Sequence, residues 1–187
     1  MSIFDKINDI KKKAVNMIKS AVSPKETFTF SVLPESLSDM QRMPEATLDS
    51  PYKTAALTVC ALCAYSKNKE VGVQMLDFLR GPRPLSPTDL SFLKDRFMDG
   101  QNYIPFSFFN GATPQNDYAP DRPYTLTVTS NQYSDDNKGY KKLYVQSGGA
   151  DSLRAIILRQ AQTGVWYLWE QELLSGIRKP ASQNLWK

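Results

Sequence analysis

Hydrophobic and polar side chains follow two different rhythms along this chain. Over residues 36–98 apolar side chains recur with the three-to-four-residue spacing typical of helices, whereas several segments within residues 104–170 alternate between apolar and polar. A helix with one apolar side and a strand with one apolar face bury those surfaces against each other. The chain is therefore expected to have an α+β fold, in which a helical layer (residues 36–98) packs on a mostly antiparallel sheet (residues 104–170).

The helical layer contains start and stop signals. Ser50-Pro51 is an N-cap serine followed by proline at the first helical position, and residues 52–65 are apolar nearly all round, which predicts a buried central helix. A second helix is expected over residues 68–80, ended by Gly81-Pro82. Ser86-Pro87-Thr88-Asp89 has the form of a capping box with Asp in place of Glu, which predicts a third helix.

Short alternating segments predict the strands. Thr27–Leu33 alternates Phe and Val with Thr and Ser, and is expected to join the sheet as an additional strand. The other strands are expected at residues 104–109, 124–129, 140–146, 153–159 and 165–170. Gly148-Gly149 separates two of them, and we expect a tight turn there that requires positive φ. Arg178-Lys179-Pro180 is expected to pin the C-terminal tail to the sheet.

Residues 2–22 have the pattern of an amphipathic helix, with apolar side chains repeating about every 3.5 residues and lysines on the other side. The chain is thus divided into an amphipathic helical appendage, residues 1–24, and a single α+β domain, residues 25–187. The pattern leaves three placements open for the appendage. It docks on its own domain, pairs with a second copy or another protein, or lies on an anionic membrane surface.

The absence of histidine narrows the chemistry more than any other feature of the composition. The 187 residues contain no His, which removes the commonest general base and the commonest metal ligand. Enzymes whose mechanism depends on His are therefore excluded, while chemistry that uses Asp, Glu, Lys, Tyr or Cys is not. No metal and no cofactor is expected.

The net charge of +4 is concentrated at the N-terminus. Residues 1–25 contain six lysines and two aspartates, so the rest of the chain is neutral overall. A nucleic-acid-binding face needs clustered Lys and Arg on a folded surface, so this distribution argues against a nucleic-acid partner. No secretory signal and no apolar run of the ~20 residues needed to span a membrane is visible. The expected location is cytoplasmic, with a membrane-peripheral location as the alternative.

Cysteine and carboxylate side chains are the candidate reactive groups. Cys60 and Cys63 lie in the middle of the expected buried helix, far from the helix N-terminus that would lower a thiol pKa, so they are expected to be buried structural thiols. Two carboxylate pairs have the residue types that glycosidases use, Asp95 with Asp99 and Glu170 with Glu172. Solvated surface positions are the simpler interpretation of both pairs.

Aromatic side chains are concentrated in the last expected strand. Alternation places Trp166 on one face of that strand and Tyr167 and Trp169 on the other. One of these faces packs on the helical layer as core. The other face either forms a second apolar layer, covered by the N-terminal helix or the tail, or stays open to bind a peptide, a strand edge or a sugar.

The C-terminal part of the chain also carries a run of short motifs. They are Gly149-Ala150-Asp151-Ser152-Leu153-Arg154, Leu158-Arg159, Gly164-Val165-Trp166-Tyr167-Leu168-Trp169-Glu170 and Leu174-Ser175-Gly176-Ile177-Arg178-Lys179-Pro180. Together they resemble the C-terminal signature of a bacterial domain-of-unknown-function family, and the resemblance extends from about Phe28 to Pro180. It implies a bacterial origin and a single α+β domain, and it supplies no catalytic residue.

These observations favour a non-catalytic binding or assembly protein of the bacterial cytoplasm. The residues expected to make contacts are Lys11, Lys12, Lys13, Trp166 and Trp169. The expected partner is a second copy or another protein, held through residues 2–22, and the sequence specifies no small-molecule ligand. Two alternatives stay open: a His-independent hydrolase that uses a carboxylate pair, and a membrane-peripheral protein attached through the N-terminal helix.

Overall fold

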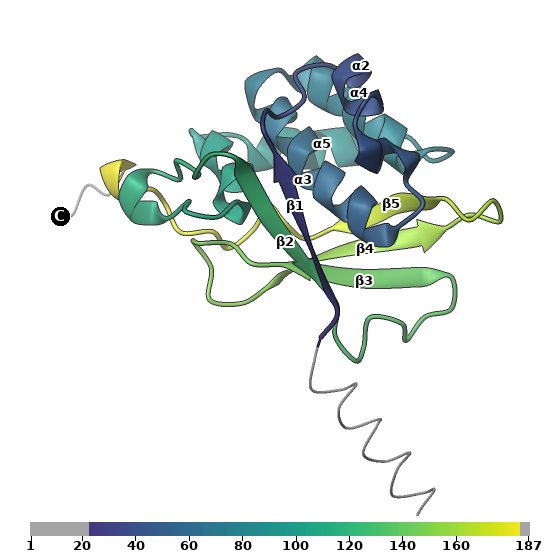
Figure 1. The fold of residues 1–187 in the computed structure, drawn as a ribbon. Helices are drawn as coiled ribbons and strands as arrows, with labels where there is room; N and C mark the ends of the chain where they lie inside the picture. The colour runs from purple at the N-terminus through teal and green to yellow at the C-terminus, as the bar shows by residue number, and fades with distance from the viewer. Residues whose placement is uncertain (1–22, 184–187) are drawn as a thin grey trace, which may run out of the picture.

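A five-stranded sheet with helices on one face forms the body of the protein (Figure 1). The computed structural model describes residues 23–183. The strands are β1 (Lys25–Phe30), β2 (Tyr124–Thr129), β3 (Tyr140–Val145), β4 (Arg154–Gln160) and β5 (Trp166–Gln171). They lie in the order β1-β2-β3-β4-β5, and each is antiparallel to its neighbours. The predicted α+β class is confirmed.

The α-helices lie in the expected part of the chain, and the helical layer extends beyond it into one 3₁₀ helix. Its α-helices are α2 (Leu37–Gln41), α3 (Pro51–Lys67), α4 (Lys69–Arg80) and α5 (Pro87–Arg96), and its 3₁₀ helices are η1 (Pro44–Thr47) and η2 (Gln101–Phe108). Two more 3₁₀ helices, η3 (Pro114–Asn116) and η4 (Ala181–Gln183), lie nearer the C-terminus. The predicted capping box is present, because the hydroxyl of Ser86 accepts from the backbone N–H of Asp89 while the Asp89 carboxylate accepts from the N–H of Ser86.

Helix α3 is the centre of the core. Every side chain from Thr54 to Tyr65 is buried, and the helix packs against α4 and η2 as well as against the sheet. Its two buried threonines are satisfied, since Thr58 donates to the carbonyl of Thr54 and Thr54 donates to the carbonyl of Trp166. The predicted central helix is therefore confirmed, and it holds the last strand through a hydrogen bond as well as through apolar contact.

Burial in α3 makes the two cysteine thiols inert. Cys60 and Cys63 are free and fully enclosed, and burial raises the pKa of both thiols well above the usual value. Because the thiolate is the reactive form, neither cysteine should react with a thiol reagent in the folded protein. We expect no labelling by 5,5′-dithiobis(2-nitrobenzoate) at pH 8 and labelling of both thiols in denaturant. Stoichiometric reaction of the native chain would contradict this.

The sheet has one apolar face and one largely polar face. Its inward side chains include Phe28, Phe30, Leu126, Val128, Leu143, Val145, Ile156, Leu158 and Leu168, all of them buried. On the outer face of β1 and β2 the threonines pair across the strands, with Thr27 Oγ1 2.9 Å from Thr127 Oγ1. This alternation is what the sequence pattern predicts for these strands.

The prediction of a strand at residues 104–109 is wrong. Residues 104–108 belong to η2, in which Tyr103, Ile104, Ser107 and Phe108 are all buried, and Phe109 is the residue that ends it. Pro105 stands inside this segment and has no N–H to give to a ladder. The apolar run is buried because it packs against α3 rather than because it alternates, so the sheet after β1 begins only at residue 124.

Within residues 23–183, no helix is both long enough and apolar enough to cross a bilayer. The predicted N-terminal helix, residues 2–22, lies outside the described residues, so its three possible placements stay predictions.

Candidate functional site

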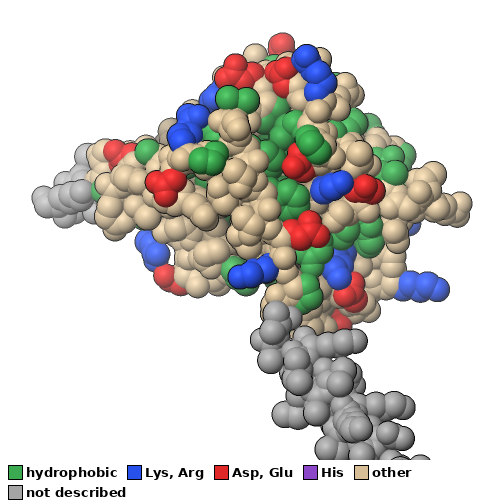
Figure 2. Space-filling model, viewed as in Figure 1, with side chains coloured by type: hydrophobic (Ala, Val, Ile, Leu, Met, Phe, Trp, Pro, Cys, Tyr) green, Lys and Arg blue, Asp and Glu red, His purple; other side chains and the backbone are tan. Residues whose placement is uncertain are grey.

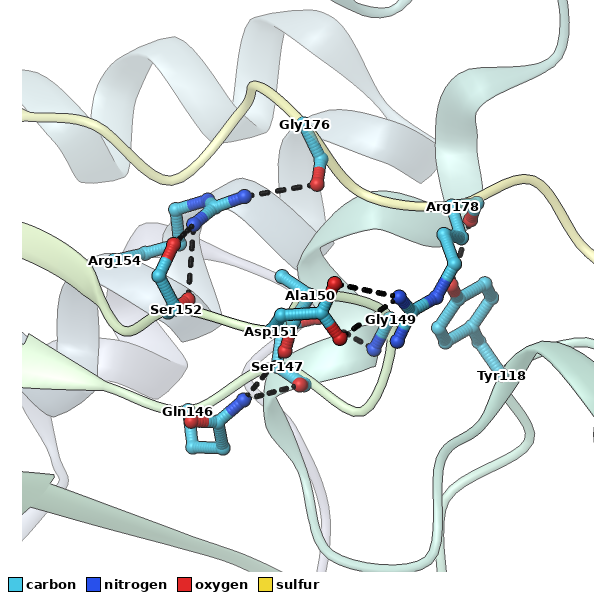
Figure 3. A network of polar contacts seen from close by, with 10 residues as sticks. All are labelled: Tyr118, Gln146, Ser147, Gly149, Ala150, Asp151, Ser152, Arg154, Gly176 and Arg178. Atoms are coloured by element: carbon cyan, nitrogen blue, oxygen red, sulfur yellow. Dashed lines mark hydrogen bonds and ion pairs between the residues drawn. The ribbon is translucent and has the colours of Figure 1, made fainter.

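The C-terminal motifs form a clamp, a set of polar contacts of Arg154 and Arg178 that joins the C-terminal tail to the β3–β4 connection (Figure 3). Arg154 donates to the carbonyls of Ser152, Ser175 and Gly176, each at 2.8 to 2.9 Å. Arg178 pairs with Asp151 at 2.9 Å. These arginines tie the C-terminal tail to the connection between β3 and β4, as the sequence suggested for Arg178. Both guanidinium groups are occupied by the chain itself, so the clamp has a structural role.

Tyr118 locks the same tail from the other side. Its hydroxyl donates to the carbonyl of Arg178 at 2.6 Å, and its ring stacks on Tyr103 with 5.1 Å between centroids. Burial, and then the neighbouring Tyr103, raises the pKa of Tyr118 to about 12, so the hydroxyl keeps the proton that it donates. Gly149 lies directly against this hydroxyl, and a side chain there would overlap it.

The two tryptophans of β5 lie in different surroundings. Trp166 packs against the core, and its backbone N–H donates to the carbonyl of Leu48 at 2.8 Å. Trp169 stands beside the outer-face residue Tyr140, with the rings 5.5 Å apart in an edge-to-face arrangement. Trp166 is therefore a partly buried residue on the core side of the strand, and Trp169 is the one of the pair that a ligand could touch.

Two arginines lie over the indole of Trp169. The guanidinium carbon of Arg83 is 4.1 Å from the ring centre and that of Arg159 is 4.8 Å from it, and Arg159 is also 5.3 Å from the centre of Tyr140. Such contacts are worth about 0.5–1 kcal/mol each at exposed sites. We call Arg83, Tyr140, Arg159 and Trp169 the Trp169 cluster. Its members come from β3, β4, β5 and the segment after α4.

A buried arginine beneath the cluster fixes its geometry. The side chain of Arg80 is only 6% exposed, and it donates to the carbonyl of Arg83 at 3.0 Å and to the carbonyl of Trp169 at 3.5 Å. It also pairs with Asp89 at 3.3 Å. Burial lowers the pKa of Arg80, and the nearby Asp89 opposes that shift. Arg80 thus holds one flanking arginine and the tryptophan in place from below.

Three grooves meet at Trp169 in the described part of the chain. The loop groove, about 560 Å³, runs to the β2–β3 connection and is lined by Tyr133, Asp136, Lys138, Tyr140, Lys142, Tyr144 and Glu170 among others. The arginine groove, about 310 Å³, is lined by Arg80, Pro82, Arg83, Arg159, Gln160, Ala161, Tyr167, Leu168 and Trp169. The carboxylate groove, about 290 Å³, includes Asp89, Phe92, Glu170 and Glu172.

The arginine groove has the most unbalanced charge of the three. Three arginines line it and no carboxylate does. Arg80 is neutralised by Asp89, but Arg83 and Arg159 form no ion pair within residues 23–183. Apart from Gln160, the remaining wall is apolar or aromatic and includes Pro82, Tyr167 and Trp169. This combination can hold an anionic group together with an apolar or planar body.

A larger hollow at the end of β1 lacks this imbalance. It measures about 710 Å³ and is lined by Val32, Asp39, Arg42, Lys67 and Arg122 among others. Two of its three cations pair with its carboxylates, Arg42 with Asp39 at 3.0 Å and Lys67 with Glu35 at 3.8 Å, while Arg122 lies over the ring of Tyr124 at 4.0 Å. Acidic and basic side chains are likewise interspersed over the face shown in Figure 2.

The candidate carboxylates divide into two groups. Asp95 and Asp99 are exposed and line none of the three grooves, whereas Glu170 and Glu172 line the carboxylate groove together. Glu172 also lies 4.0 Å from the ammonium of Lys142. Both glutamates are exposed, so neither has the apolar surroundings in which a carboxylic acid works as a general acid.

Of the two predicted contact residues that the structure describes, Trp166 and Trp169, only Trp169 lines the candidate site. Trp166 packs against the core, and Lys11, Lys12 and Lys13 lie outside the described residues. The arginines of the cluster were missed, and no local spacing could have found them because they come from separate elements. Among residues 23–183, no group of three or more Cys, Asp or Glu side chains is arranged to hold a metal ion.

A comparison with protein families supports the family resemblance that the C-terminal motifs indicated. The family described as "Domain of unknown function (DUF6935)" matches residues 32–181. The chain belongs to this family. Neither a search of curated proteins nor a search of solved structures finds a match. The DUF6935 match spans α2 to β5 and so includes the whole Trp169 cluster, whereas β1 precedes it.

Proposed function

We propose that this DUF6935 protein is a non-catalytic binding protein that takes an anionic ligand in the arginine groove. The observation that carries the proposal is that Arg83 and Arg159 flank an aromatic wall and have no ion-pair partner in residues 23–183. Guanidinium groups bind carboxylates and phosphates through paired hydrogen bonds, and these charge-assisted bonds are about twice as strong as neutral ones.

The groove also defines the rest of the ligand. Its volume of about 310 Å³ matches a small ligand or one or two side chains of a peptide. Its apolar wall, with Tyr167 and Trp169, favours a ligand whose charged group is attached to an aromatic or aliphatic body. A bacterial cytoplasmic location is part of the same proposal, and it is supported by the lack of a disulfide framework, since both cysteines of the sequence lie three residues apart in one buried helix.

The test is a titration of the full chain with three matched probes. Binding is monitored through the indole and guanidinium signals in ¹H–¹⁵N NMR spectra. Phenyl phosphate and hippurate carry an anionic group on an aromatic body, while benzamide has the body without the charge. We expect saturable shifts at Trp169 from the two anions, with benzamide at least about tenfold weaker, because the arginines contribute about 1–3 kcal/mol per charged hydrogen bond.

Arg159→Gln is the informative variant, because Arg159 is exposed and makes no hydrogen bond that the fold needs. Arg122→Gln is its matched control, since Arg122 also lies over a tyrosine but lines the hollow near β1. Arg159→Gln should weaken the binding of both anions about tenfold or more, and Arg122→Gln should leave it unchanged. Equal binding of benzamide and the anions, or equal effects of the two variants, would refute the proposal.

A hydrolase is the second candidate, on the single observation that Glu170 and Glu172 share one groove beside Trp169. The same samples address it. Release of phenol from phenyl phosphate, or of glycine from hippurate, would favour the hydrolase over the binding protein.

A further inference from the structure

The two edges of the sheet differ in how many of their outward backbone groups form hydrogen bonds. The outer edge of β5 is covered, because Trp166 donates its N–H to Leu48 and accepts from Thr54 at its carbonyl, and Arg80 and Arg83 donate to the carbonyl of Trp169. The opposite edge is β1, which within residues 23–183 pairs with β2 on one side only (Figure 1). An uncovered edge is a template for a further strand.

The register of β1 shows which backbone groups face outward. The N–H of Ser130 donates to the carbonyl of Pro24 at 2.8 Å, so these two residues form a hydrogen-bonded pair. Such pairs alternate along an antiparallel ladder, which directs the backbone groups of Glu26, Phe28 and Phe30 toward β2. Those of Lys25, Thr27 and Thr29 therefore point away from the sheet.

An independent contact supports this assignment. Thr125 lies opposite Thr29, and its carbonyl accepts from Asn110, outside the β1–β2 ladder, at 2.8 Å. Thr29 and Thr125 thus form a pair whose backbone groups face away from each other. Within residues 23–183, the outward N–H and C=O groups of Lys25, Thr27 and Thr29 have no hydrogen-bond partner.

We propose that this edge pairs antiparallel with the same edge of a second copy of the chain, about a two-fold axis at Thr27. The three outward-facing residues are symmetric about Thr27. The outward N–H groups of each copy therefore lie opposite outward C=O groups of the other, and up to about six backbone hydrogen bonds can form. This register sets Lys25 opposite Thr29 and Glu26 opposite Phe28, and no like charges face each other.

The distribution of charge along β1 favours pairing with a second copy, because it does not protect the edge against association. Edge strands that avoid association carry charges along their length, especially lysine. Here both charges stand at the start of the strand, and Thr27–Phe30 carries none. The threonine ladder that joins β1 to β2 on the outer face would continue across the axis through Thr27 of each copy. A six-residue strand pair buries less than a standard interface, so the dimer is a reversible one.

The decisive variant is Thr27→Pro in the full chain, measured by sedimentation over about 5–500 µM protein. Proline at this position removes the outward N–H while leaving the bonds of Glu26 and Phe28 to β2 in place. Thr27→Ala is the matched control, because it keeps the outward N–H and removes only the exposed side-chain contacts of Thr27, with Thr127 and across the axis. We expect the native chain and Thr27→Ala to dimerise within about twofold of each other, and Thr27→Pro to dimerise at least about tenfold more weakly.

Amide hydrogen exchange of the native chain tests the proposal without a variant. The amides of Thr27 and Thr29 should exchange rapidly in dilute solution and become protected as the concentration rises, whereas those of Glu26 and Phe28 should stay protected throughout. A monomer at all concentrations, or protection at Thr27 and Thr29 that is independent of concentration, would overturn it. A dimer that survives Thr27→Pro but is lost in Ile7→Asp would instead assign assembly to residues 2–22.

Discussion

Gly148→Ala is expected to lower the free energy of unfolding by about 3 kcal/mol or more. A methyl group at this position would overlap the carbonyl oxygen of Ala112, which is backbone and cannot rotate away. The N–H of Gly148 also donates to the carbonyl of Ser107 at 2.8 Å, so the two segments are held together at this point. Equilibrium unfolding in guanidinium chloride, followed by far-UV circular dichroism, measures the loss.

Gly139→Ala separates the two reasons why a glycine is needed. Gly139 has φ +80 but no heavy atom within 4 Å of an added Cβ, so alanine there suffers backbone strain alone, about 1 kcal/mol. Gly148 is not among the glycines with positive φ, so only the close approach disfavours alanine. Equal losses for the two variants would mean that the contact with Ala112 relaxes and that the explanation is wrong.

The Gly148-Gly149 pair shows a limit of prediction from local sequence patterns. The expectation of a positive-φ turn at Gly148-Gly149 is wrong, since neither residue has positive φ. The pair is needed because Gly148 meets Ala112 and Gly149 meets the hydroxyl of Tyr118, both from the connection before β2. A pattern in one segment carries no information about which distant backbone will lie against it.

Elements defined by neighbours in sequence were predicted well. Period-two alternation located β1 and β2 to within a few residues, and the N-cap serines located α3 and α5, because both signals depend on contacts within a few residues. The strand at 104–109 failed because its apolar run is buried on several sides in a 3₁₀ segment, where alternation has no meaning.

The candidate site depended on contacts that the sequence does not reveal. Trp169 could be chosen from its place in an alternating strand, but Arg80 and Arg83 reach it from the end of α4. Arg159 reaches it from the neighbouring strand, where the register shift between Ile157 and Leu158 adjusts the pairing. Such a cluster exists only once helices and sheet are packed together.

Arg80→Met is expected to destabilise the protein by about 3 kcal/mol at pH 7 and to weaken anion binding in the arginine groove. Methionine fills a similar volume but leaves the carbonyl of Arg83 without its donor and the half-buried Asp89 without its cation, while the carbonyl of Trp169 keeps only the bond from Arg83. Arg83→Met is the matched control. Arg83 is exposed and its side chain makes a single hydrogen bond, to the carbonyl of Trp169, so the loss of that side chain should cost less than about 1 kcal/mol while still weakening binding.

The pH dependence distinguishes a broken ion pair from simple loss of packing. Burial raises the pKa of Asp89, but the N–H and hydroxyl of Ser86 and then Arg80 outweigh it and leave the pKa below its usual value. A carboxyl whose folded pKa is lowered stabilises the fold above its unfolded pKa, about 4, and loses that contribution as the pH falls. In Arg80→Met the Asp89 carboxylate keeps its bonds to Ser86 but loses the cation, so protonation by acid costs this variant less stability than it costs the native chain. The difference between the native chain and Arg80→Met should therefore shrink between about pH 5 and pH 3. A difference that stays constant across this range would mean that Arg80 acts through packing alone.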